Sequence, residues 1–174
     1  KFSGGGILLD QGIHMIDLIR YLYGEFSEFY SCISNDYWNY DIEDNAFILL
    51  RDNKGVVAFL HSTATQWQHK FLMEITLQKG LIELKGILSG TKSYGRENIK
   101  ILSKSDIRYK KTGEKHFFKV DNSWKEEVHE FGNLILKKKK IYEGNILEAE
   151  RVMSTIDKIY RADKRWYNFI KKLK

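Results

Sequence analysis

The feature that most restricts the fold is a long middle region, from Glu25 to about Val120, whose pattern indicates consecutive β-strands. Apolar and polar residues alternate there, most regularly from Phe71 to Leu77, as they do in strands that bury one face. Turn residues at 52–55 and 79–80 follow so closely on the strands that no helix fits between them. Consecutive strands joined by tight turns pair antiparallel, so the sequence predicts an antiparallel sheet.

Patterns typical of helices flank the predicted sheet. The first runs from about Gly6 to Tyr23 and is apolar around more than half of its circumference, which is typical of a buried helix. Gly24 can end it because glycine tolerates the left-handed conformation found at helix C-termini. Towards the end of the chain, apolar residues recur at intervals of three and four around Phe131 and Ile159, which predicts two closing helices. We therefore expect an α+β fold, with a predominantly antiparallel sheet and helices packed on one face.

The composition excludes several classes of protein. Hydrophobic residues make up 43% and charged residues 30% of the 174 residues, as in a globular domain rather than a disordered or fibrous chain. No apolar run approaches the roughly 20 residues that span a bilayer, so we expect no membrane partner. Cys32 is the only cysteine, which leaves no disulfide and no multi-cysteine zinc site and favours a cytoplasmic location. The net charge of +6 is common among soluble proteins, so nucleic-acid binding is not expected.

The candidate site lies at the start of the first predicted helix. Three glycines at 4–6 lead into Asp10, His14 and Asp17, which are spaced four and three residues apart. Residues at this spacing share one side of a helix, so the three form a polar stripe on an otherwise apolar helix. Two carboxylates and an imidazole are costly to bury without partners or a cavity. The stripe is therefore a hydrogen-bonded structural cluster, a face turned to solvent, or a catalytic site.

The residue types of this stripe suit proton transfer. Asp10 can accept a hydrogen bond from one nitrogen of His14, which fixes the tautomer and leaves the other nitrogen to take a proton from a substrate hydroxyl. The glycines at 4–6 allow another backbone or a ligand to approach closely. Gly12 lies between the two polar groups, where we expect a side chain to obstruct a cleft.

The pattern Ser-Gly-Gly-Gly-x-x-x-Asp-x-Gly-x-His-x-x-Asp at residues 3–17, followed by an apolar helix that ends at Gly24, resembles the glucose-fructose oxidoreductase/inositol dehydrogenase (Gfo/Idh/MocA) family. The match lies in the C-terminal domain of that family, and the later strands and helices are similar in order. The resemblance implies oxidation of a sugar or cyclitol hydroxyl, or the reverse reduction, by an NAD(P)-dependent enzyme. It implies that Asp10 and His14 are the catalytic residues and bind the substrate, with His14 as the acid/base. Asp17 matches the pattern too, and we expect a structural role for it.

The chain also departs from the family. It contains no proline, so it cannot carry the Glu-Lys-Pro motif of the family's nucleotide-binding domain, and no Gly-x-Gly-x-x-Gly follows a predicted strand. We therefore expect residues 1–174 to be a single C-terminal substrate and oligomerisation domain that lacks the N-terminal Rossmann domain. NAD or NADP would bind the full-length enzyme and not this chain tightly, and we expect the chain alone to be inactive.

Two functions other than that of an oxidoreductase domain are compatible with parts of the sequence. The first is a non-catalytic interaction module that keeps the fold and dimerises through the open sheet face; that half-polar face carries Val57, Phe59, His61, Thr63 and Thr65. The second, a basic nucleic-acid-binding domain, has no support besides the charge. Glu126, His129 and Glu130 could share a metal on one helix turn, but no second cluster supplies further ligands, so we expect no metal. Residues 67–69 could line a sugar site, although a surface loop is favoured.

Overall fold

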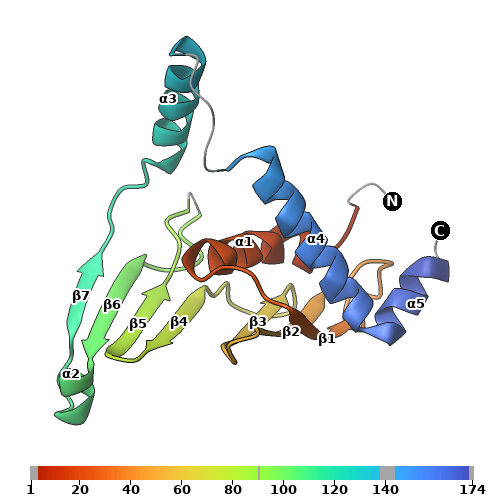
Figure 1. The fold of residues 1–174 in the computed structure, drawn as a ribbon, viewed down its shortest axis with the longest axis horizontal. Coiled ribbons are helices and arrows are strands. Elements are labelled where there is room, and N and C mark those ends of the chain that lie inside the picture. The colour runs from red at the N-terminus through yellow and green to blue at the C-terminus, as the bar shows by residue number, and fades with distance from the viewer. Residues whose placement is uncertain (1–3, 90, 138–143, 173–174) are drawn as a thin grey trace. The chain divides into compact units, whose positions relative to one another are not determined.

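The computed structural model describes residues 4–89, 91–137 and 144–172. The internal contacts of the chain divide it into two compact units (Figure 1). Unit 1 combines residues 1–66 with residues 141–174, and unit 2 consists of residues 67–140. In the described part of the chain, none of the helices has the length and apolar character needed to cross a bilayer.

Unit 1 contains a three-stranded antiparallel sheet in the order β1-β2-β3. Its elements in chain order are η1 (Leu8–Gly12), α1 (Ile13–Leu22), β1 (Glu28–Ser34), β2 (Asn45–Arg51), β3 (Val57–Thr63), α4 (Ile146–Ala162) and α5 (Lys164–Lys172). The predicted turn after β2 is present: the Asp52 carboxylate accepts the N–H groups of Lys54 and Val56, both at 2.8 Å. This turn sets the register in which Phe47 lies opposite His61.

The core of unit 1 lies between one face of this sheet and the helices. η1 contacts β3, α4 contacts β1, and α1 contacts α4, so all three cover the same face (Figure 1). The buried apolar side chains are Leu8, Ile16, Phe26, Ile33, Ala46, Ile48, Leu50, Leu60, Val152, Ile156, Ile159 and Trp166. Burying a large aliphatic side chain contributes about 1.5–3 kcal/mol, so this cluster is the main source of stability for the unit. The predicted α+β fold with helices on one sheet face is confirmed.

The opposite face of the three strands is exposed, and about half of its side chains are apolar. It carries the predicted Val57, Phe59 and His61 on β3 and, beside them on β2, Phe47 and Leu49. The rings of Phe47 and His61 stack with centroids 4.0 Å apart. Exposed apolar surface of this kind marks an interaction site in many proteins.

The position of His61 predicts a pH dependence of stability. Burial lowers the pKa of His61 below its ordinary value of 6.5. The unfolded chain therefore binds this proton more readily than the folded chain, and stability is greatest above pH 6.5 and falls as the pH drops through 6.5 towards the lower pKa of the folded state. Urea unfolding of the native chain and of His61→Phe between pH 8 and pH 5 measures this, and the native curve should be the steeper below about pH 6.5. Parallel curves would contradict the prediction.

Unit 2 contains a second antiparallel sheet, in the order β4-β5-β6-β7. Its elements are β4 (Leu72–Leu77), β5 (Gly80–Lys85), β6 (Asn98–Ser103), α2 (Lys104–Arg108), β7 (Glu114–Phe117) and α3 (Ser123–Leu136). The predicted strands are present, but they form two sheets instead of one. The strand β3 ends at Thr63, where its hydroxyl oxygen accepts the N–H of Thr65, and residues 64–71 lie outside the strands.

Two helices were not predicted. α2 begins with a capping box, in which the Ser103 hydroxyl accepts the N–H of Asp106 and the Asp106 carboxylate accepts the N–H of Ser103. α5 follows α4 directly because the Asp163 carboxylate accepts the N–H of Trp166 and also the N–H of Ile33 on β1. The two predicted closing helices are present as α3 and α4, and a third helix, α5, follows them and buries Trp166 in the core of unit 1.

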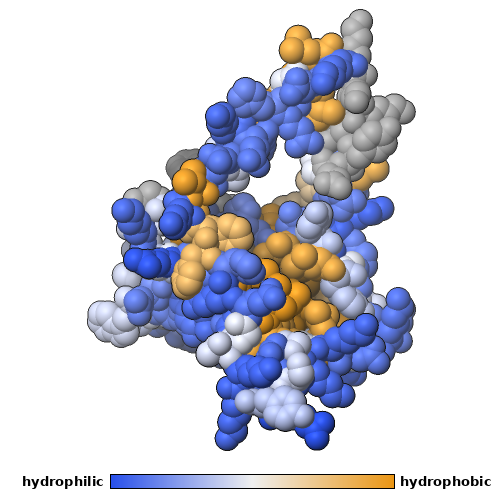
Figure 2. Space-filling view, turned by 90° about the vertical axis from the view of Figure 1, so that its left-hand side faces the viewer, coloured by the Kyte–Doolittle hydropathy of each residue, from blue (hydrophilic) through white to orange (hydrophobic). Residues whose placement is uncertain are grey.

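The predicted apolar stripe of α3 is present but unpacked. Its members Trp124, Val128, Phe131, Ile135 and Leu136 are all more than half exposed. Both hydrophobic and hydrophilic side chains of this helix lie at the surface at the top of Figure 2.

Candidate active site

The helix that carries the candidate residues begins differently from the prediction. Residues Leu8–Gly12 form a π-helical segment, η1, and the α-helix α1 begins only at Ile13. Asp10 lies within η1 and His14 lies in the first turn of α1, and both side chains are exposed. Single π-helical turns inside helices occur frequently at functional sites, where they change the direction of a side chain.

The predicted hydrogen bond between Asp10 and His14 is not formed. The Asp10 carboxylate instead accepts a hydrogen bond from the side-chain amide of Gln11, at 3.1 Å. The π-helical turn explains this, because it alters the angular offset between residues 10 and 14 that a regular α-helix would give. Both side chains are exposed to solvent near the N-terminal end of the helix. Catalytic hydrogen bonds often form only when substrate binds.

Asp17 belongs to a network that holds the helix in place. One of its carboxylate oxygens lies 3.9 Å from Nη1 of Arg20, and Arg20 is buried. The Arg20 guanidinium also pairs with the carboxylates of Glu25 and of Glu148 on α4. This contact with Arg20 lowers the pKa of Glu25. The surroundings of Asp17 thus agree with a structural role.

The glycines at the start of the helix admit another segment of backbone. A Cβ placed on Gly6 would lie 2.7 Å from the nitrogen of Glu43 and even closer to its carbonyl oxygen. The N–H of Ile7 donates to that carbonyl oxygen at 3.0 Å. The segment before β2 therefore lies directly against the helix entry, and only glycine leaves room for it.

Gly12 does not have the role expected from the sequence. It is buried, and a Cβ at this position would lie 2.8 Å from the side chain of Leu8 and 3.2 Å from the hydroxyl of Ser62 on β3. Its small size therefore allows η1 to pack closely on the sheet. The expectation that it keeps a cleft open is wrong, because it faces the interior of unit 1.

Glu43 is a site residue that the sequence did not reveal. Its side chain is only 3% exposed, and its carboxylate accepts the N–H of Leu8 at 3.1 Å and the hydroxyl of Tyr160 at 2.6 Å. Burial and the Glu43 carboxylate raise the pKa of Tyr160, so its hydroxyl stays protonated and remains a donor. A carboxylate at a helix N-terminus is stabilised by the unpaired N–H groups there. Glu43 thereby joins the entry of the candidate helix to α4.

The Glu43 contact gives a second prediction. Tyr160→Phe removes a hydrogen bond to a buried carboxylate and should reduce the free energy of unfolding by about 1–3 kcal/mol. Urea denaturation followed by Trp166 fluorescence measures the loss in unit 1. Tyr167→Phe is a matched control, because its hydroxyl accepts only an exposed hydrogen bond from Arg161. A Tyr160→Phe variant as stable as this control would show that the contact contributes little.

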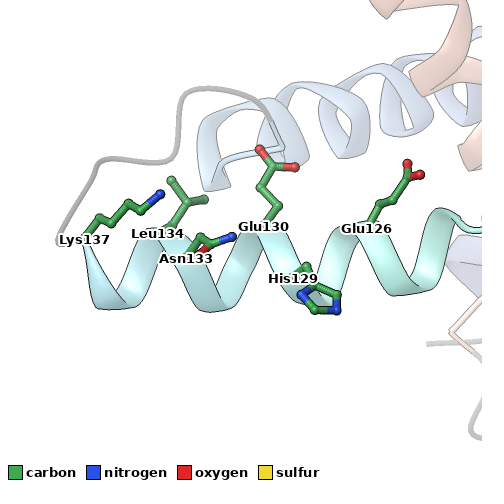
Figure 3. Close-up of a pocket in the computed structure, with 6 residues that line it drawn as sticks. All are labelled: Glu126, His129, Glu130, Asn133, Leu134 and Lys137. Carbon is green, nitrogen blue, oxygen red and sulfur yellow. The ribbon is translucent and has the colours of Figure 1, made fainter.

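The other candidate site residues considered in the sequence belong to unit 2. In Figure 3, Glu126 and Glu130 rise from one side of α3 while the His129 ring hangs from another, and all side chains that line this hollow come from the one helix. No group of three potential metal ligands occurs within the described residues. Trp67 is fully exposed, and His69 shares a hydrogen bond with the Ser93 hydroxyl within unit 2, 2.9 Å away.

Comparison with known proteins supports the resemblance found in the sequence. Residues 1–83 match the GFO/IDH/MocA C-terminal domain. No curated protein matches the chain in sequence. Among solved structures, levoglucosan dehydrogenase in complex with NADH and levoglucosan is 18% identical with a TM-score of 0.75, and the match covers 94% of this chain and 49% of that chain. Aldose-aldose oxidoreductase from Caulobacter crescentus, complexed with glycerol, is 20% identical with a TM-score of 0.70, covering 94% and 47%.

A UDP-N-acetylglucosamine 3-dehydrogenase from Acidithiobacillus ferrooxidans is similar at 16% identity and a TM-score of 0.69, covering 92% of this chain and 48% of that chain. The chain thus spans about half the length of the solved structures that it matches. At these identities the likeness shows the fold. The predicted resemblance is confirmed over residues 1–83, which match the model of the GFO/IDH/MocA C-terminal domain.

Proposed function

We propose that this chain is the substrate-binding and oligomerisation domain of an NAD(P)-dependent oxidoreductase that acts on a CH–OH group of a sugar or cyclitol. The main support is the exposed pair Asp10 and His14 at the π–α junction, within the residues that match the family. Two similar structures hold polyhydroxylated molecules, levoglucosan in one and glycerol in the other. A cytoplasmic location would suit such an enzyme.

In this proposal the chain supplies the proton-transfer half of the reaction. An imidazole nitrogen of His14 takes the hydroxyl proton as the alcohol is oxidised to the ketone, while the hydride from the same carbon would go to NAD(P)+ held outside this chain; the reverse reaction returns both. Asp10 orients the imidazole and accepts a hydrogen bond from a neighbouring substrate hydroxyl. General acid–base catalysis of this kind increases the reaction rate by a factor of about 10²–10⁴.

The dinucleotide does not fit the described residues of this chain. Both sheets are antiparallel, and no glycine-rich turn leads from a parallel strand into a helix. That arrangement is the one that holds the pyrophosphate of NAD or NADP. We therefore infer that a separate nucleotide-binding domain, on the same or another polypeptide, holds the cofactor.

A second candidate function has its own support. The exposed outer face of β1–β3, with Phe47, Leu49 and Phe59, suits a module that only pairs with a second copy. The enzyme and the module would both form homo-oligomers through this face. Light scattering of the purified chain measures that state, and Phe59→Glu should convert an oligomer to a monomer under either function.

Turnover separates the two functions. The chain should give no NAD(P)H signal with sugars or cyclitols alone, and should give one when combined with a separately supplied nucleotide-binding domain. Light scattering first establishes that the two parts associate. Association without turnover of any aldose, anhydrosugar or cyclitol would favour the interaction module.

A further inference from the structure

The loop between β1 and β2 exposes three aromatic side chains within four residues. In this aromatic loop, residues 35–41, Tyr37 is 64% exposed, Trp38 is 51% exposed and Tyr40 is 63% exposed. Large aromatic side chains usually bury most of their surface, and clusters that do not are enriched where another molecule binds. Tyr37 and Trp38 meet edge to face, with ring centroids 5.0 Å apart and planes at 81°.

The backbone of the aromatic loop is fixed by hydrogen bonds. Asp44 is 3% exposed, and one of its carboxylate oxygens accepts the N–H groups of Tyr37 and Trp38, each at 3.0 Å. The N–H of Asn39 donates to the carbonyl of Asn35 at 3.0 Å, and the side-chain amide of Asn35 donates to the carbonyl of Tyr40. A buried carboxylate thus holds the rings at the surface. Such preorganisation reduces the entropy cost of binding a ligand.

The aromatic loop is also tied to the start of the candidate helix. Asp44, which holds the loop, is adjacent in sequence to Glu43, which accepts the N–H groups of Ile7 and Leu8. Leu8 is the first residue of η1, which carries Asp10. The aromatic rings and Asp10 therefore belong to neighbouring segments of unit 1, joined by two consecutive buried residues.

The charge near the loop favours neutral sugars over sugars that carry phosphate groups. The chain has no lysine or arginine between Arg20 and Arg51, and Asp36 and Asp41 flank the aromatic residues. In the structure, Arg165 and Asp36 line the same small hollow, so one cation and one carboxylate lie there together. A phosphate or nucleotide diphosphate would be repelled here, whereas the hydroxyls of a neutral sugar can donate to the carboxylates. The apolar C–H face of a pyranose ring packs on an aromatic ring.

We propose that Tyr37, Trp38 and Tyr40 form a platform for a neutral sugar ring, next to the ring that Asp10 and His14 act on. This assignment rests on the proposed function for the role of that second ring. The substrate class would then be a neutral glycoside of two or more rings, and not a nucleotide sugar. The loop binds the sugar whether or not the chemistry at His14 takes place.

The test uses the whole chain labelled with 5-fluorotryptophan and followed by fluorine NMR. The chain has four tryptophans, and each resonance is assigned with a Trp→Phe variant. Maltose and cellobiose are the probes, and UDP-glucose is the charged comparison. We expect a saturable shift of the Trp38 resonance with at least one disaccharide, and a weaker effect of UDP-glucose at equal concentration.

The variants separate the proposal from its alternatives. Tyr40→Ala should weaken disaccharide binding by roughly tenfold, as the loss of one ring contact implies. Trp124→Ala, which removes an exposed tryptophan of α3, should leave it unchanged. The resonance of the buried Trp166 reports that unit 1 is folded in each variant. The Trp38 shift is measured on the chain alone, without cofactor or turnover, so binding here is measured independently of the proposed chemistry.

Three results would overturn the proposal. The first is a Trp38 resonance that no disaccharide moves while the Trp166 resonance is native. The second is a stronger effect of UDP-glucose than of both disaccharides. The third is a folded Tyr40→Ala variant that binds as tightly as the native chain.

Discussion

Gly6→Ala is expected to unfold unit 1 or to reduce its free energy of unfolding by about 3 kcal/mol or more. The added Cβ would lie 2.7 Å from the nitrogen and 2.8 Å from the carbonyl carbon of Glu43, closer than real Cβ contacts. Because both neighbours are backbone atoms, no side chain can rotate to make room. The segment before β2 would have to move away, which breaks the hydrogen bonds of Ile7 and Leu8 to Glu43. Overpacking costs about 1–3 kcal/mol, and each buried polar group left unpaired costs about as much again.

Urea denaturation followed by Trp166 fluorescence measures this loss, because Trp166 is buried in the core of unit 1. Gly132→Ala is the matched control: it lies inside α3, and a Cβ there would have no atom within 4 Å. Alanine should stabilise that helix by about 0.5–1 kcal/mol. A Gly6→Ala chain with native stability would mean that residues 6 and 43 are not in contact.

Local patterns predicted the elements of the fold well where each element buries one side. β2 illustrates this, since the predicted face of Ala46, Ile48 and Leu50 is the buried one. The end of β3 and the start of α5 could not be predicted from local patterns. β3 ends at Thr63 because of a local side-chain turn, and α5 begins because Asp163 binds the N–H of Ile33, a residue 130 positions away. Neither event leaves a periodic signal in the sequence.

In the candidate site, too, local spacing predicted some features and contacts between distant segments decided the others. The spacing of Asp10 and His14 was enough to place both at one end of the helix, and both are exposed there. Glu43 was not predictable, because its burial depends on Tyr160, 117 positions away in the chain. The π-helical turn likewise depends on packing against the segment at Glu43 and against Ser62. A sequence pattern can therefore place candidate groups on one helix, while their orientation is decided by contacts between distant segments.

His14→Ala is expected to lower kcat/KM by about 10²–10⁴ in the enzyme assembled with its nucleotide-binding domain, since it removes the group proposed to exchange the hydroxyl proton. The effect should fall mainly on kcat, because proton transfer takes place in the transition state and not in substrate binding. The measurement is the initial rate of NAD(P)H formation across substrate concentrations. Stability should change by no more than about 0.5 kcal/mol, because the side chain is exposed and contributes nothing to the core.

Two further variants make this result specific. Asp10→Asn keeps the shape of the side chain but removes its charge, so it should lower the rate less than His14→Ala if Asp10 only orients the imidazole. Asp17→Asn is the matched control, since Asp17 lies one turn beyond His14 and only contacts Arg20, at 3.9 Å. It should leave the rate within about twofold of the native enzyme, because Asp17 is exposed and Arg20 keeps its pairs with Glu25 and Glu148. If His14→Ala retained activity within the same range, the proton would have to be transferred by another group, and Asp10 and His14 would lose their proposed roles while the fold assignment stood.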